Sequence, residues 1–215
     1  MTTGGDAGLH VPDRDVLLAS SLEIAPLLLG AVLRHETPDG AVSVRITEVE
    51  AYIGDGLDPG SHAFRGRTRR NAVMYGPPGH LYTYFTYGMH VCANVVCSPE
   101  GEASAVLLRA GEVVEGEELA AARRGGPSGR SIPHRDLARG PARLVVAAGM
   151  SLADDGADLY APPFSLRLPR TPLPYETGPR TGVSGAGGGA AFPWRFHLPG
   201  EPSVSPYKRH PKSGD

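Results

Sequence analysis

The chain has 215 residues, which is long enough for one sizeable hydrophobic core. Its 21 prolines and 29 glycines predict many turns and short elements, and the two cysteines, Cys92 and Cys97, do not suggest a disulfide-stapled secreted scaffold. No apolar run approaches the ~18 residues of a membrane span. The N-terminus lacks the basic and apolar regions of a targeting peptide, so we expect a soluble, intracellular protein.

The net charge of −2 argues mildly against a nucleic-acid partner, but the charges are unevenly placed. Residues 59–99 contain four arginines and no acidic residue. Residues 119–151 contain six arginines and one acid, Asp136. This distribution predicts two basic surface patches; the alternative, that the arginines are merely solvated, stays open.

Apolar spacing predicts one or two short helices over residues 13–29, interrupted by Pro26. A strand is expected over 29–35. The Pro-Asp-Gly turn at 38–40 should lead into a second strand over 42–52. The alternation of apolar residues changes register late in that strand, which predicts a bulge near Glu48.

Residues 53–79 have weak periodicity and many turn residues, which is typical of a long functional loop with local helical turns. A second hairpin is expected over 80–96, with its turn at Gly88-Met89. A strand should follow over 105–109. The order of acids before arginines predicts a helix over 115–124.

Residues 140–148 begin with Gly-Pro, which favours a helix. Residues 154–174 are Pro-rich strand and turn material, 184–191 form a Gly-rich loop, and 194–198 form a last strand. We therefore expect a mixed α/β fold in a single domain at 13–205, with a largely antiparallel curved β-sheet, flanking helices and a protruding β-hairpin. Tails are expected at 1–12, disordered, and at 206–215, basic and mobile.

Glu50 follows a β-rich run and neighbours Tyr52, so it is a candidate general base toward water. Position alone favours an exposed strand-end residue, and Glu48 competes because alternation places both acids on one face. Tyr82 reads as core, whereas Tyr87, beside the hairpin turn, could stack on or wedge between bases.

The histidines are scattered, and no CxxC, HExxH or paired-Asp motif is present. We expect no metal ion and no cofactor.

Four motifs, taken together in order and spacing, resemble the alkyladenine (3-methyladenine) DNA glycosylase family. They are Glu-Ala-Tyr at 50–52, Ser-His-Ala at 61–63, Pro-Gly-His-Leu-Tyr at 78–82 and Tyr-Phe-Thr-Tyr-Gly-Met-His at 84–90. The likeness is strongest over about 27–109 and continues to about 198. It implies a base-excision repair enzyme that hydrolyses the N-glycosidic bond of alkylated or deaminated purines in double-stranded DNA, acting as a monomer.

The resemblance implies a role for each matching residue. Glu50 would activate the attacking water, with Arg109 beside it. The flipped base would lie in a pocket whose residues are Tyr52, His62, Tyr84 and Asn94, the last opposing the 2-amino group of guanine. The DNA would be contacted by an intercalating tyrosine and by groove residues, namely Tyr87, Met89, Thr68, Met74 and Arg67.

Two features depart from the family pattern: the Arg69-Arg70 pair, where proline often precedes arginine, and the unusually Gly-rich stretch at 184–191. The only lysines are Lys208 and Lys212, far from Glu50 in sequence, which disfavours a Schiff-base lyase step. Two other classes stay open: a non-catalytic nucleic-acid binding module, and an enzyme acting on another N-glycoside such as a free nucleoside.

Overall fold

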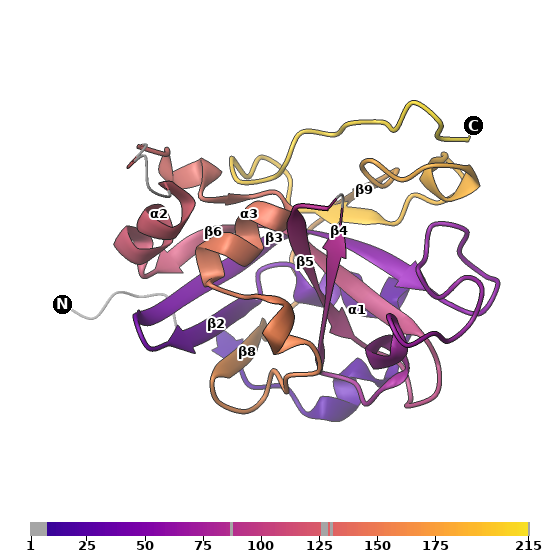
Figure 1. Cartoon of the computed structure of the whole chain (residues 1–215), viewed down its shortest axis with the longest axis horizontal. Helices are drawn as coiled ribbons and strands as arrows, with labels where there is room; N and C mark the ends of the chain where they lie inside the picture. The colour runs from indigo at the N-terminus through magenta and orange to yellow at the C-terminus, as the bar shows by residue number, and fades with distance from the viewer. Residues whose placement is uncertain (1–7, 87, 126–128, 130, 215) are drawn as a thin grey trace.

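The computed structural model describes residues 8–86, 88–125, 129 and 131–214. Most of the expected N-terminal tail lies outside these residues. Within the described part of the predicted tail, Leu9 and His10 form a short strand. The predicted C-terminal tail is described to Gly214 and runs along the top of the molecule in Figure 1.

The described residues form a single domain built on one antiparallel sheet with the strand order β1-β8-β2-β3-β6-β5-β4 (Figure 1). Strands β9, β10 and β7 extend it, with β10 pairing β3 and β9, and β7 pairing β6. The strands are β1 (Leu9–His10), β2 (Val32–Thr37), β3 (Gly40–Ile53), β4 (Leu81–Thr86), β5 (His90–Val96), β6 (Ser104–Glu115), β7 (Ala138–Arg139), β8 (Phe164–Pro169), β9 (Glu176–Gly178) and β10 (Arg195–His197). The predicted mixed α/β fold with an antiparallel sheet is confirmed.

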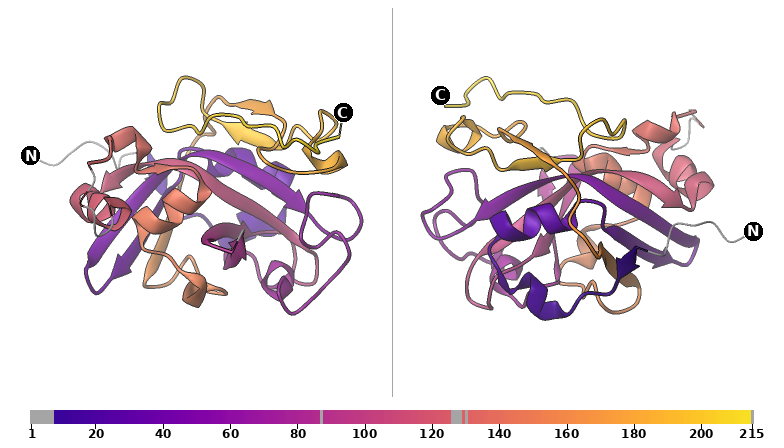
Figure 2. Two further views of the ribbon diagram at one scale, coloured as in Figure 1. Left: turned by 45° about the horizontal axis from the view of Figure 1, so that its top comes forward. Right: turned by 180° about the vertical axis from the view of Figure 1, so that it is seen from behind.

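Within the described residues three α-helices accompany the sheet: α1 (Ser21–Leu28), α2 (Glu117–Gly125) and α3 (Pro141–Ala148). Short 3-10 helices are η1 (Arg14–Leu18), η2 (Ala72–Tyr75), η4 (His134–Asp136), η5 (Leu152–Asp154) and η6 (Ala186–Gly188). The two views of Figure 2 show α1 and α3 on opposite sides of the sheet. Helix α3 begins as expected with proline in its first turn and ends at Gly149, which has the left-handed φ of 71° that favours glycine.

Strand β3 is the central strand, paired with β2 on one side and with β6 on the other. Its apolar residues Val42, Val44 and Ile46 are fully buried. The register to β6 shifts on both sides of Glu48, so the predicted bulge is confirmed. The bulge leaves Glu48 and Glu50 both within reach of Arg109 on β6.

The predicted end of the strand at 109 and the start of the helix at 115 were wrong. Strand β6 continues to Glu115 because its later acids find partners on β3: Glu112 binds Arg45 at 2.8 Å, and Glu115 accepts a hydrogen bond from Ser43. Gly116, with φ of 75°, then separates the strand from helix α2.

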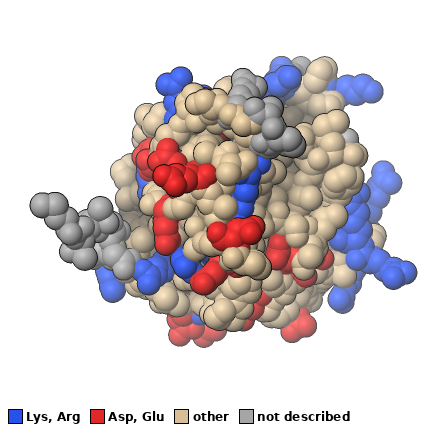
Figure 3. Space-filling model, turned by 60° about the vertical axis from the view of Figure 1, so that its left-hand side comes forward, with Lys and Arg blue, Asp and Glu red and all other residues tan. Residues whose placement is uncertain are grey.

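Two basic patches were predicted, at residues 59–99 and 119–151. The first prediction agrees with the exposure of its arginines, and the second fails for half of its arginines. The arginines at 65, 67, 69 and 70 are exposed. In the second region three arginines are partly buried and donate hydrogen bonds to backbone carbonyls, namely Arg123, Arg124 and Arg139. These side chains stabilise the fold instead of forming an open patch. On the side shown in Figure 3, acidic and basic side chains are mixed, so that side has no single sign of charge.

Gly111 tests how tightly β3 and β6 approach each other. A Cβ atom placed there would lie 2.6 Å from the carbonyl oxygen of Arg45, a backbone atom that cannot move aside cheaply. Gly111→Ala is therefore expected to lower the free energy of unfolding by about 1–3 kcal/mol. Denaturant titration measures this. Gly178→Ala is the matched control because nothing lies within 4 Å of its added Cβ, and equal midpoints for the two variants would contradict the prediction.

Candidate active site

A cavity of about 290 Å³ opens between β3, the hairpin β4–β5 and the loop at 181–184. This volume lies near the lower end of the range of about 300–1,000 Å³ for small-molecule sites. Its walls bring together six residues that the sequence singled out: Glu50, Tyr52, His62, Tyr84, Asn94 and Arg109. These residues come from four strands and one loop, so only the tertiary fold makes them neighbours.

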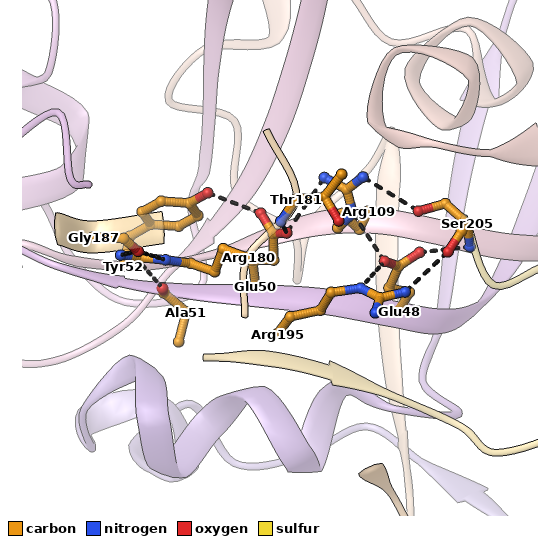
Figure 4. Close-up of polar contacts among 10 residues, drawn as sticks. All are labelled: Glu48, Glu50, Ala51, Tyr52, Arg109, Arg180, Thr181, Gly187, Arg195 and Ser205. Carbon is orange, nitrogen blue, oxygen red and sulfur yellow. Dashed lines mark hydrogen bonds and ion pairs between the residues drawn. The ribbon is translucent and has the colours of Figure 1, made fainter. Parts of the chain in front are cut away.

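Glu50 is fully buried and its two carboxylate oxygens have different partners (Figure 4). Oε1 accepts a hydrogen bond from the backbone N–H of Thr181 at 2.7 Å and lies 3.4 Å from Nη1 of Arg109. Oε2 accepts a hydrogen bond from the hydroxyl of Tyr52 at 2.8 Å. Burial and the negative charge of Glu50 raise the pKa of Tyr52 well above its ordinary value, so the phenol remains a donor.

Glu48 lies behind Glu50 and holds the opposite side of Arg109. Its carboxylate accepts hydrogen bonds from Nε of Arg109 at 2.9 Å, from Nε of Arg195 at 2.5 Å and from the backbone N–H of Ser205 at 2.7 Å. It does not line the cavity. The geometry therefore favours Glu50 over Glu48 as the carboxylate that can meet a substrate.

Arg180 also supports the site, although it was not among the site residues predicted from the sequence. It is fully buried, and its guanidinium binds both oxygens of Asp58 at 2.6 Å. The same guanidinium lies 4.5 Å from the ring centroid of Tyr52 and donates a hydrogen bond to the carbonyl oxygen of Ala51. Arg180 therefore fixes the tyrosine whose hydroxyl binds Glu50. The sequence signal for it was its place in the stretch Pro-Arg-Thr-Gly-Val at 179–183, through which the resemblance to the family continues.

An aromatic cluster forms another wall of the cavity. The ring of His62 packs edge-on against Tyr84, with centroids 4.5 Å apart, and its Nδ1 lies 3.2 Å from the hydroxyl of Tyr82. Burial raises the pKa of Tyr82 to about 12, and Tyr82 is 1% exposed, as expected for a core residue. Partial removal from water and the positive charge of Arg70 lower the pKa of His62, which stays neutral at pH 7.

Asn94, on β5, also lines the cavity. Its amide nitrogen donates a hydrogen bond to the carbonyl oxygen of Tyr82 at 3.0 Å, which fixes the orientation of the amide. Cys92, two residues earlier on β5, lines the same cavity.

The residues expected to contact DNA occupy different environments. Met89, at the end of the hairpin, is 68% exposed, and Arg67 and Thr68 are exposed in the long loop. Met74 is only 2% exposed and lines the cavity, so it lies in a wall and not on an open groove. Tyr87 lies outside the described residues.

Among the described residues, no group of three or more His, Cys, Asp or Glu side chains could hold a metal ion. In the same part of the chain, no helix is long and apolar enough to cross a membrane.

The cluster behind Glu50 should make stability depend on pH. Burial alone would raise the pKa of Glu48, but Arg109, Arg195 and Ser205 outweigh it and the pKa lies below the ordinary value of 4.5. A carboxylate of this kind stabilises the fold above pH 4.5 and loses that contribution as the pH falls toward its native pKa.

Glu48→Gln should therefore lower the free energy of unfolding at pH 7 by about 3–5 kcal/mol and weaken its acid dependence. Chemical denaturation from pH 7 to pH 3 measures both effects. A variant whose stability matches the wild type at pH 7 would show that the cluster contributes little.

The chain is similar in sequence to a known protein family and to several named proteins. The family model described as methylpurine-DNA glycosylase matches residues 15–202. A protein of Leifsonia xyli subsp. xyli is 77% identical over 208 residues, covering 97% of this chain and 98% of the relative. Proteins of Streptomyces avermitilis and Nocardia farcinica are 56% and 50% identical and cover 92% and 86% of this chain, with the same shares of their own lengths.

All three relatives carry the provisional name 3-methyladenine DNA glycosylase. The family match spans every residue that lines the cavity, and also Glu48 behind Glu50. The chain belongs to the methylpurine-DNA glycosylase family.

Proposed function

We propose that the protein is a monofunctional DNA glycosylase that removes alkylated or deaminated purines from double-stranded DNA, with Glu50 activating the attacking water. The observation that carries this proposal is the position of Glu50: a buried carboxylate in the wall of a cavity that is also lined by Tyr52, His62, Tyr82 and Tyr84. Its neighbours in the cavity are the residues that match the motifs of this family.

The contacts of Glu50 suggest which oxygen acts. Oε1 already has two partners, Thr181 and Arg109, whereas Oε2 has one, the hydroxyl of Tyr52. A carboxylate oxygen can accept two hydrogen bonds, so Oε2 retains a position for water. As the bond between the sugar carbon and the base nitrogen breaks, the water oxygen bonds to that carbon and its proton passes to Glu50. The electron pair of the broken bond leaves with the base.

The aromatic wall fits a flipped purine. Tyr52, His62 and Tyr84 provide ring surfaces, and stacking contributes roughly 1–3 kcal/mol per base, comparable to the cost of unstacking one. His62 is neutral at pH 7 because its pKa is lowered. A neutral imidazole does not repel a purine that alkylation has made cationic, and such a purine leaves without full acid catalysis.

The chemistry should stop at an abasic site. A lyase reaction needs an amine that forms a Schiff base with the sugar. The only two lysines are exposed in the C-terminal segment, and neither lines the cavity. The residues that line the cavity therefore favour hydrolysis by water alone, without a lyase step.

Other proposed DNA contacts do not line the cavity. The exposed Arg67, Thr68 and Met89 are available to the DNA backbone and groove, and Tyr87 is proposed to fill the space left by the flipped base. Met74, which lines the cavity, is proposed to contact the DNA from that wall.

Glu50→Gln tests the base directly. The substitution keeps the size of the side chain but removes the proton acceptor, so single-turnover excision of hypoxanthine or 3-methyladenine should fall by about 10²–10⁴-fold. Binding to the same lesion duplex should persist, as a gel-shift titration can measure. Excision by the variant at the wild-type rate would rule out Glu50 as the base. If the wild type produced no abasic sites on any alkylated or deaminated duplex, the binding-module alternative would be supported.

Asn94→Ala tests selection against normal guanine. Removing the amide opens space where the 2-amino group of guanine would lie, and loss of one such contact corresponds to roughly tenfold in discrimination. The ratio of guanine to hypoxanthine excision should therefore rise in matched duplexes. An unchanged ratio would show that the fixed amide of Asn94 does not exclude guanine.

A further inference from the structure

The C-terminal segment 205–214 lies beyond the end of the family match at residue 202. It contacts two groups that hold Glu50 in place: the Glu48–Arg109 cluster and the loop that carries Thr181. At its start, Ser205 joins the cluster behind Glu50: its N–H donates to Glu48, its carbonyl oxygen accepts from Arg195 and its hydroxyl oxygen accepts from Arg109. Ser205 is 6% exposed, so this anchor is part of the interior.

The far end of the segment binds the loop that forms the opposite support. The N–H of Gly182 donates to the carbonyl oxygen of Lys208 at 2.9 Å, and that of Gly185 donates to Lys212 at 2.7 Å. The N–H of Gly214 in turn donates to the carbonyl oxygen of Gly185 at 2.7 Å. Figure 1 shows this yellow segment lying beside the orange loop.

The loop held in this way carries the backbone N–H that binds Glu50. Thr181 donates that hydrogen bond, and residues 181–184 line the cavity. The loop itself is rich in glycine: residues 184–191 are all serine, glycine or alanine. Such a sequence loses much conformational entropy on ordering, so it needs partners that hold it in one conformation.

The glycines of the loop permit a close backbone approach. A Cβ atom on Gly189 would lie 2.7 Å from the carbonyl oxygen of Gly214, and one on Gly188 would lie 2.7 Å from the hydroxyl oxygen of Ser213. The Gly-rich composition, which had no assigned role in the sequence analysis, is therefore what allows the C-terminal segment to lie against the loop.

We infer that residues 205–214 act as a positioning segment for the reaction: they hold the 181–185 loop, and through it the Thr181 N–H, against Glu50, while Ser205 holds Arg109 from the other side. This inference rests on the proposed role of Glu50. The segment touches no reacting atom, so its effect should appear in the rate of the chemical step and not in affinity for DNA.

Gly189→Ala tests the contact between the loop and the C-terminal segment by adding one methyl group between them. The backbone at Gly189 has φ of −82°, which alanine adopts without strain, and the closest contact of the added methyl group would be with the carbonyl oxygen of Gly214 at 2.7 Å, against 3.2 Å for that of Ala186 within the loop. The methyl group therefore acts mainly by pushing the segment away from the loop. Single-turnover excision of a hypoxanthine duplex should fall roughly 10- to 100-fold, with unchanged Kd for that duplex. Gly178→Ala, with open space around its Cβ, is the matched control and should keep the wild-type rate. A chain ending at residue 206 should lose rate in the same way.

The charges of the segment are tested separately. Lys208 and Lys212 are exposed, so the variant Lys208→Gln, Lys212→Gln keeps the backbone contacts while removing two cations. It should retain the wild-type single-turnover rate at saturating enzyme. If this variant lost as much rate as Gly189→Ala, or if Gly189→Ala and the truncated chain kept the full rate, the positioning role would be overturned.

Hydrogen exchange measures the same contact without using activity. The amides of residues 182 and 185 should exchange slowly in the wild type and in Gly178→Ala, and faster in Gly189→Ala. Fast exchange in the wild type would overturn the positioning role even in an active enzyme. Absence of excision by the wild type would instead count against the proposed function, and the exchange rates would still report on the segment.

Discussion

Three buried carboxylates and three buried arginines face one another across the centre of this protein, and the active site depends on their balance. Glu48, Glu50 and Asp58 are fully buried, and Arg109, Arg180 and Arg195 are no more than 7% exposed. Removing one member leaves an uncompensated charge in a medium of low polarity, which costs several kcal/mol. The six side chains therefore fix the relative positions of β3, β6, β10 and the 58–60 and 180–187 loops.

Buried ion pairs are weak evidence for stability, because well-packed apolar residues can often replace them at no loss. The arrangement of these ion pairs is better explained by the way in which they position Glu50. Arg109 binds Glu48 and Glu50 together, and Arg180 supports the ring of Tyr52 while its neighbour Thr181 binds Glu50. Arg109 thus contacts the carboxylate in the cavity directly, Arg180 reaches it through Tyr52, and Arg195 reaches it through Glu48 and Arg109. The ion pairs hold that carboxylate in a defined orientation.

Local signals in the sequence predicted the parts of the fold that short-range physics decides. The Pro-Asp-Gly turn, the Gly-Pro start of α3 and the change of alternation near Glu48 each depend on neighbouring residues, and all three are confirmed. The six cavity residues were found through the resemblance to the family, four of them within its motifs, and the fold does bring them together. Arg180 could not be assigned in this way because its partners, Asp58 and Tyr52, lie more than 120 residues away. The end of β6 was misplaced for a similar reason: its acids are satisfied by Arg45 and Ser43 on another strand.

The site is divided between a sheet and a loop. This division explains why the sequence predicted the site residues on the strands but not those on the loop. Glu50, Tyr52 and Arg109 project from strands whose backbone hydrogen bonds are made within the sheet, so their positions follow from strand pairing. Thr181 projects from a glycine-rich loop that has little apolar surface to bury and must be ordered by contacts made elsewhere in the chain. A hydrogen bond of 2.7 Å to Glu50 needs both parts to be positioned to a fraction of an ångström. The sheet supplies this precision through its own pairing, whereas the loop acquires it only where other segments bind it. Asp58 binds the side chain of Arg180, and the carbonyl oxygens of residues 208 and 212 accept hydrogen bonds from the backbone of the loop.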